Sequence, residues 1–169
     1  MEIVNRVAQS TLITIDLGDF IVDGERVLFD LKNYLYMDQI LREKDFREFI
    51  QQHDCSIYQD KHVAITCSVD AIIPHWAFML VSSKLQPFAL TIYFGDLSSL
   101  ENHLIVNSLS RINLEEIKGK KIVIKGCGEK DISPAAFVEI TRLLRPYAAS
   151  IMYGEPCSTV PVYKRSIQP

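Results

Sequence analysis

Residues 121–153 read KIVIKGCGEKDISPAAFVEITRLLRPYAASIMY, and this stretch decides the fold class. The apolar run at 121–125 has the length and composition of a buried strand. Ser133 can cap the helix that follows, and Pro134 suits the first position of that helix. A second apolar run begins at Ser150. A strand, a capped helix and another strand in this order predict a parallel strand–helix–strand unit.

The same alternation of strands and helices begins earlier in the chain, at residue 62. Apolar runs at 62–67 and 89–94 are typical of strands, and helical stretches at 71–88 and 97–110 alternate with them. This alternation favours an α/β fold with a mostly parallel sheet and helices on both faces. No internal repeat is evident along the chain.

The first 60 residues have a different pattern. Two strand-like runs at 12–16 and 26–31 flank a turn-rich segment, which predicts an N-terminal antiparallel β-hairpin. Residues 44–52 then have the periodicity of a short amphipathic helix. We expect a single α/β domain over residues 1–169, in which this hairpin and helix precede the strand–helix core of residues 61–169.

Composition excludes several classes of protein. With 169 residues, 48% of them hydrophobic, the chain can bury a substantial core and is neither disordered nor fibrous. A net charge of −3 gives no electrostatic basis for binding nucleic acid or an anionic membrane. There is no signal-like start and no apolar stretch of the ~20 residues that a membrane span needs. We therefore expect a cytoplasmic protein, with self-association into a homo-oligomer as an open possibility.

Three of the four cysteines follow separate predicted strands. They are Cys67, Cys127 and Cys157, and the carboxyl ends of parallel strands form the edge where α/β sheets bind ligands. Thiolates select zinc, copper(I) and iron–sulfur centres, and Asp70, Asp96 or Glu155 could supply a fourth ligand. The pattern predicts a three-cysteine site for zinc or an iron–sulfur cluster. The alternative is that these thiols are small buried side chains.

Three other functions stay open at the same edge. A thiol-dependent enzyme acting on a small molecule would use Cys157 as its nucleophile, with His75 as the histidine nearest to this edge. An anion pocket would use the glycines at 126–128, although this segment lacks the known phosphate-loop motifs and Asp96 is one of several acidic residues at the same edge. A non-catalytic interaction protein would need only packed cysteines and a surface for association.

Several strings of residues carry a resemblance to a known family. These strings are Leu12–Leu17, Leu41–Arg47, Cys67–Pro74, Phe94–Leu97, Lys125–Cys127 and Gly154–Pro161. Through them the chain resembles, from end to end, the bacterial domain-of-unknown-function family numbered 2480. The resemblance brings no established activity. It implies an accessory role beside the sulfur-mobilisation machinery of iron–sulfur assembly, with assembly proteins as partners.

The resemblance favours five residues as metal ligands because they stand inside the matching strings: Cys67, Asp70, Cys127, Glu155 and Cys157. His75 and Cys55 lie outside the strings and gain no support from it. Cys55, in a polar stretch of the N-terminal part, is interpreted as an incidental loop thiol.

Overall fold

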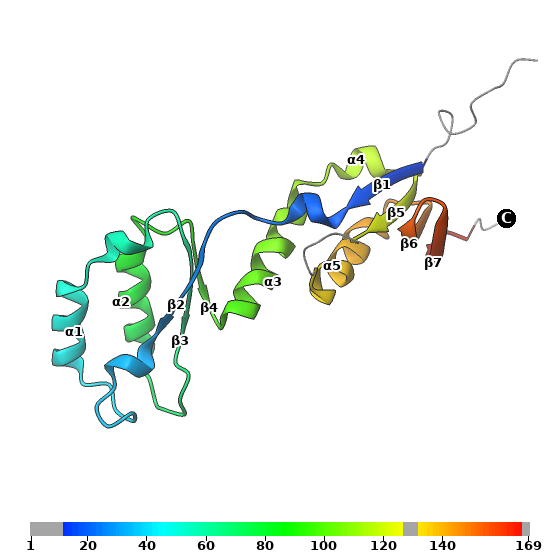
Figure 1. Ribbon diagram of the computed structural model, residues 1–169. Helices are drawn as coiled ribbons and strands as arrows, with labels where there is room; N and C mark the ends of the chain where they lie inside the picture. The colour runs from blue at the N-terminus through cyan, green and yellow to red at the C-terminus, as the bar shows by residue number, and fades with distance from the viewer. Residues whose placement is uncertain (1–11, 127–131, 167–169) are drawn as a thin grey trace, which may run out of the picture. The chain divides into compact units, whose positions relative to one another are not determined.

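The computed structural model describes residues 12–126 and 132–166, and their strands form two sheets (Figure 1). The four-stranded sheet has the order β1 (Leu12–Asp16), β5 (Lys121–Lys125), β6 (Ser150–Glu155), β7 (Ser158–Lys164). The three-stranded sheet has the order β2 (Arg26–Asp30), β3 (His62–Thr66), β4 (Thr91–Phe94). All pairs are parallel except β6 with β7. The predicted α/β class with mostly parallel strands is confirmed, but the strands expected in one sheet are divided between two.

The chain divides into two compact units, each with its own hydrophobic core. Unit 1 comprises residues 1–22 and 104–169, and unit 2 comprises residues 23–103. That the two units form a single domain stays a prediction. No helix in the described parts of the chain is long and apolar enough to cross a membrane.

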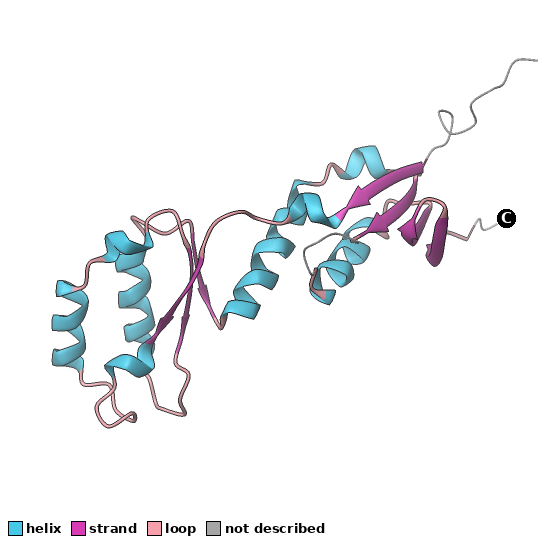
Figure 2. Ribbon diagram, in the orientation of Figure 1, coloured by secondary structure: helices cyan, strands magenta, loops and turns pink. Residues whose placement is uncertain are grey.

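Helices and short 3-10 turns alternate with the strands along the chain (Figure 2). The α-helices are α1 (Glu43–Gln52), α2 (His75–Leu85), α3 (Leu97–Ser108), α4 (Leu114–Ile117) and α5 (Pro134–Leu144). The 3-10 helices are η1 (Leu17–Phe20), η2 (Leu31–Tyr34), η3 (Cys55–Tyr58) and η4 (Leu109–Arg111). The helix expected at 71–88 begins only at His75, because Pro74 disfavours helical geometry in the residue before it.

One face of the unit 2 sheet packs against α1 and α2, which lie on the same side of it (Figure 1). Val27, Val63 and Ile92 stand opposite one another in register and share this face. Phe46 of α1 and Val81 of α2 are buried in the same core. Every second strand residue therefore enters the core, as the alternation of side chains along a strand requires.

Polar side chains occupy the opposite face of that sheet, where Arg26, His62 and Thr91 stand in register. His62 is only 3% exposed, and its ring nitrogens lie 3.0 Å from Thr91 Oγ1 and 2.9 Å from the carbonyl oxygen of Asp23. Arg26 donates to both carboxylate oxygens of Glu101, at 2.7 and 3.1 Å. The contacts of His62 satisfy a ring that would otherwise be costly to bury, whereas Arg26 and Glu101 form a partly exposed ion pair.

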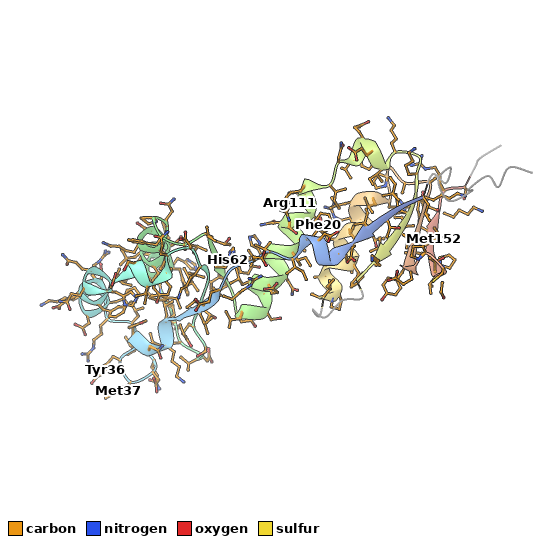
Figure 3. The ribbon with its side chains drawn as sticks, turned by 45° about the horizontal axis from the view of Figure 1, so that its top comes forward. Phe20, Tyr36, Met37, His62, Arg111 and Met152 are labelled. Carbon is orange, nitrogen blue, oxygen red and sulfur yellow. The ribbon has the colours of Figure 1, made fainter. Side chains whose placement is uncertain are left out.

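In unit 1 the sheet buries Ile122 and Ile124 against Ile140 of α5. At the end of η1, the backbone carbonyl oxygen of Phe20 accepts a hydrogen bond from Ser108 Oγ at 2.5 Å. The Arg111 guanidinium lies over the Phe20 ring, 6.0 Å from its centre (Figure 3). The segment after β1 is thus held within unit 1.

The two units are copies of one fold, contrary to the expectation of no internal repeat. Elements of unit 1 begin 59 residues after their counterparts: β5 at 121 against β3 at 62, α5 at 134 against α2 at 75, and β6 at 150 against β4 at 91. Identical residues at this spacing include Ile65/Ile124, Ala77/Ala136, Phe78/Phe137, Leu85/Leu144, Pro87/Pro146, Ala89/Ala148, Ile92/Ile151 and Gly95/Gly154. Strand registers also correspond, since Arg26–His62–Thr91 matches Leu12–Lys121–Ser150.

The predicted antiparallel hairpin at the N-terminus is wrong. β1 pairs in parallel with β5, and β2 pairs in parallel with β3. The reason lies directly after each strand. Asp16 and Asp30 each accept a hydrogen bond from the backbone N–H two residues ahead, which opens a 3-10 helix instead of a tight reverse turn. Each strand therefore serves as the first strand of a different unit.

Candidate functional site

A hollow of about 540 Å³ opens at the carboxyl end of β3 in unit 2. Its lining comes from β3, the loop after it, α2 and β4: Thr66, Cys67, Val69, Asp70, Ala71, Ile73, His75, Phe78 and Phe94. This is the edge at which parallel α/β sheets bind ligands. We call this hollow the Cys67 pocket.

The Cys67 thiol stands at the point where the chain leaves the sheet. The first four residues of β3 are buried, so the strand fixes where the loop begins. Cys67 is partly buried, and its Sγ donates a weak hydrogen bond to the carbonyl oxygen of Val69 at 3.6 Å. The thiol is therefore held at the wall of the pocket.

Asp30, at the end of the neighbouring strand β2, holds the loop beyond this thiol. Its Oδ1 accepts hydrogen bonds from the backbone N–H groups of Ser68 and Lys32, both at 3.0 Å. Partial burial opposes ionisation of Asp30, yet the hydrogen bonds from Ser68 and Lys32 outweigh it and lower the pKa of this carboxyl group. Asp30 is therefore a charged anchor for the residue next to Cys67 at neutral pH.

Asp70 and His75 bring two further titratable side chains to the same pocket, and both are exposed. His75 is the first residue of α2. Pro74 stands at the N-cap of α2 and has no side-chain acceptor, whereas Ser133 accepts from Ala135 N at the start of α5. The start of α2 therefore has no side-chain cap at Pro74, and in its first turn Ala77 N donates to the carbonyl oxygen of Pro74 at 2.9 Å.

The remaining walls of the pocket are apolar. The rings of Phe78 and Phe94 meet edge to face, with centroids 5.3 Å apart. Val69 and Ile73 complete the apolar lining. A pocket lined by both polar groups and aromatic rings suits a small molecule that is itself partly apolar.

The structure brings two of the predicted metal ligands, Cys67 and Asp70, to this pocket. Cys157 is exposed in the turn between β6 and β7, and Glu155 is exposed at the end of β6, both in unit 1. Cys127 lies outside the described residues. Within residues 12–126 and 132–166, no three His, Cys, Asp or Glu side chains are grouped so that they could hold a metal ion.

Two further side chains have structural roles. Cys55 is 7% exposed in the core of unit 2, where burial raises its pKa, so it is a packing residue and not a loop thiol. Asp96 accepts a hydrogen bond from Ser99 N at 2.7 Å at the start of α3, and this interaction with Ser99 lowers the pKa of Asp96. Asp96 therefore serves as a helix cap.

The sequence did not indicate a second hollow, of about 630 Å³, in unit 1. Its lining comes from β5, α5, β6 and β7: Ile124, Phe137, Val138, Thr141, Tyr153, Val160 and Val162. The alternation of Val160 and Val162 along the C-terminal strand is the one sequence signal that points to it. We call this hollow the β7 hollow.

The model of a family described as "Protein of unknown function (DUF2480)" matches residues 1–165. No curated protein and no solved structure matches the chain.

Proposed function

This chain belongs to the family described as Protein of unknown function (DUF2480), and we propose that it binds a small, partly apolar molecule in the Cys67 pocket. The observation that carries the proposal is the gathering of Cys67, Asp70 and His75 around one hollow with apolar walls. The volume of about 540 Å³ lies within the ~300–1,000 Å³ range of small-molecule sites.

The lining suggests a role for each side chain. Phe78 and Phe94 would contact the apolar part of the ligand, while Asp70 and His75 would hydrogen-bond its polar part. Cys67 would act as the nucleophile, with His75 as its proton acceptor, because a thiolate is the strongest nucleophile that the lining offers. Cys67 takes the role that the sequence assigned to Cys157, because Cys67 lines the pocket and Cys157 does not.

Alkylation with iodoacetamide, followed by peptide mass spectrometry, tests the proposal. We expect the low-molecular-mass fraction of a cell extract to slow alkylation of Cys67, and native mass spectrometry then to give the mass of the bound compound. Cys157 is the internal control, since it lies outside the pocket and its alkylation should not change.

Two variants of α2 sharpen this test. His75→Ala should weaken the protection of Cys67, whereas Lys84→Ala, which changes an exposed residue of the same helix outside the pocket lining, should leave it intact. If the extract changes the labelling of Cys67 no more than that of Cys157, and no bound mass is found, the proposal is wrong.

A zinc or iron–sulfur site is the second candidate, and one observation in unit 1 favours it. β5 and β6 are parallel neighbours, so their carboxyl ends lie side by side. Cys127 follows β5 by two residues in sequence, and Glu155 and Cys157 come at and after the end of β6. We propose these three residues as the ligands of such a site, and an accessory role in iron–sulfur assembly, with assembly proteins as partners, would follow from it.

Metal analysis of protein purified without oxygen tests this second candidate. Stoichiometric zinc or iron should disappear in Cys127→Ser and persist in Cys55→Ala, because Cys55 is buried in the core of unit 2. Wild-type protein without metal would contradict the candidate.

A further inference from the structure

β4 and β6 are equivalent strands of the two units, but their outer edges differ. The outer edge of β6 pairs with the antiparallel strand β7, with Tyr153 opposite Val160. β4 is the last strand of its sheet in the described part of the chain. After Gly154 the chain continues through a turn into β7, whereas after the equivalent Gly95 it enters α3. Unit 2 therefore lacks a counterpart of β7.

The hollow beside each of these strands is also equivalent. A hollow of about 510 Å³ lies beside β4, and we call it the β4 hollow. Its lining residues Ile65, Phe78, Met79, Ser82 and Phe94 correspond to Ile124, Phe137, Val138, Thr141 and Tyr153 of the β7 hollow. Even the ring contacts agree, since both aromatic pairs meet edge to face, with centroids 5.3 Å apart in unit 2 and 5.7 Å apart in unit 1.

One wall distinguishes the two hollows. In unit 1, Val160 and Val162 of β7 line the hollow. In unit 2 no strand stands in that place among the described residues, and Phe94 is 69% exposed, whereas its counterpart Tyr153 beside β7 is 40% exposed. The β4 hollow therefore has the equivalent apolar lining but lacks the wall that β7 forms in unit 1.

The outer edge of β4 also lacks the devices that usually prevent strands from pairing between molecules. Proteins protect edge strands with charged residues, proline and bulges. β7 carries Pro161 and Lys164, and its pairing with β6 is irregular between Ile151 and Met152. β4 reads Thr-Ile-Tyr-Phe and carries none of these features. The unprotected edge and the open hollow thus occur at the same strand.

We propose that β4 pairs with β4 of a second copy of this chain, antiparallel, about a two-fold axis. A two-fold axis perpendicular to the sheet makes identical strands antiparallel, which is the direction in which β7 lies against β6. The same operation keeps equivalent faces on the same side, so Ile92 and Phe94 of the second copy face the β4 hollow. They take the places that Val160 and Val162 take in unit 1.

The alternative of β4 pairing with β7 of another copy fits less well. Pro161 and Lys164 protect the outer edge of β7. Such pairing also joins two different surfaces, and head-to-tail contacts of this kind lead to open-ended assemblies unless the ring closes. Pairing of β4 with β4 of a second copy instead gives a closed assembly of two subunits.

Sedimentation of the full chain tests the proposal. Wild-type protein should sediment as a dimer of the 19.3 kDa chain. Phe94→Lys should sediment as a monomer, because it places a charge on the shared apolar surface. Met37→Lys is the matched control: Met37 is 73% exposed, lies in the loop after η2 and should leave the dimer unchanged.

Hydrogen exchange identifies the surface that is used. The amides of β4 should exchange slowly in the dimer and faster on dilution, while the amides of the buried strand β3 should not respond. Met79→Lys, on α2 and outside the sheet, gives a second monomeric variant should Phe94→Lys fail to fold by circular dichroism. A monomeric wild-type protein, or a dimer that survives in the folded variants, overturns the proposal. If β4 instead pairs with a strand of another protein, the purified wild-type chain would be monomeric, which is the first of these outcomes.

Discussion

Asp60 and Gly119 hold the same place in the two copies of the fold, and both have positive φ angles, 58° and 71°. Asp60 N donates to the carbonyl oxygen of Phe88 at 3.0 Å, and Gly119 N donates to that of Tyr147 at 2.9 Å. The fold therefore requires a left-handed backbone conformation at this position, whether Asp or Gly occupies it. Glycine adopts it without steric cost, while aspartate adopts it with some strain.

Reciprocal changes at these positions should have opposite effects on stability. Asp60→Gly removes steric strain and should raise the free energy of unfolding, by at most about 1 kcal/mol. Gly119→Ala should lower it by about 1–2 kcal/mol. A Cβ at Gly119 would meet no atom within 4 Å, so that cost is one of backbone conformation alone. Urea unfolding of both variants measures the two effects, and a destabilised Asp60→Gly would contradict the equivalence.

Asp30 should give stability a specific dependence on pH. Burial opposes its ionisation, but the hydrogen bonds from Ser68 and Lys32 prevail and the pKa of Asp30 is lowered. A group with a lowered folded-state pKa stabilises the fold above its ordinary value of about 4, and this contribution is lost as the pH falls through the folded-state pKa. Asp30→Asn should therefore cost about 1 kcal/mol at neutral pH and flatten the acid loss of stability.

Urea titrations at several pH values compare Asp30→Asn with Asp38→Asn, which removes an exposed loop carboxylate from the same unit. Iodoacetamide provides a second measurement, because loss of the charged anchor at Ser68 should speed alkylation of Cys67. An Asp30→Asn protein with the wild-type pH profile and unchanged labelling would show that the carboxylate does not hold the loop.

Local signals predicted most elements of the fold. Ser133 accepts from Ala135 N at the start of α5, as the capping prediction required, and β5 spans the run at 121–125 from which the fold was inferred. Ser133 and Pro134 specify a helix start through contacts a few residues away. Elements set by such near neighbours can be predicted without knowledge of the partner strands.

Strand partners could not be predicted, because β1 and β2 carry nearly the same signal. Both strands end in Asp and are followed by a 3-10 helix that begins with Leu. Nothing in the local pattern assigns β1 to β5 or β2 to β3. The repeat was hidden for the same reason: the first strands of both copies come in succession at the N-terminus, outside the 59-residue spacing of the rest.

The same distinction between local and distant contacts applies to the candidate site residues. Cys67, Asp70 and His75 lie within nine residues of one another in sequence, so the loop after β3 brings them to one pocket whatever the strand order. Grouping Cys67 with Cys157 assumed a single sheet, and β3 and β6 belong to different sheets. The sequence alone can group residues that one loop connects, but it does not say whether residues at the ends of different strands meet.

Gly154→Ala should disrupt the pairing of β6 with β7. Gly154 has a φ of 121°, and a Cβ there would lie 2.6 Å from the carbonyl oxygen of Ser158. Backbone must therefore move, and we expect a loss of about 2 kcal/mol or more. Hydrogen exchange should quicken in β7 while β3 of unit 2 stays protected. If β7 exchanges as in the wild-type protein, Gly154 is not needed for this pairing.

Tyr58 should make the protein sensitive to alkaline pH. It is 7% exposed in the core of unit 2, and burial, assisted by Tyr34, raises its pKa to about 12. A raised folded-state pKa gives stability that is full below the ordinary value of about 10 and is lost as the pH rises through about 12. The free energy of unfolding should therefore fall by about 1–2 kcal/mol over this interval.

Tyr58→Phe separates this titration from packing. The variant loses the contact between Tyr58 Oη and His53 Nε2, 3.2 Å apart, and should be destabilised by about 1 kcal/mol at neutral pH. It should also lose part of the alkaline slope, because the buried hydroxyl can no longer ionise on unfolding. Urea midpoints at roughly pH 8 and pH 11 measure both effects in one series. A slope as steep as that of the wild-type protein would assign the alkaline sensitivity to another group.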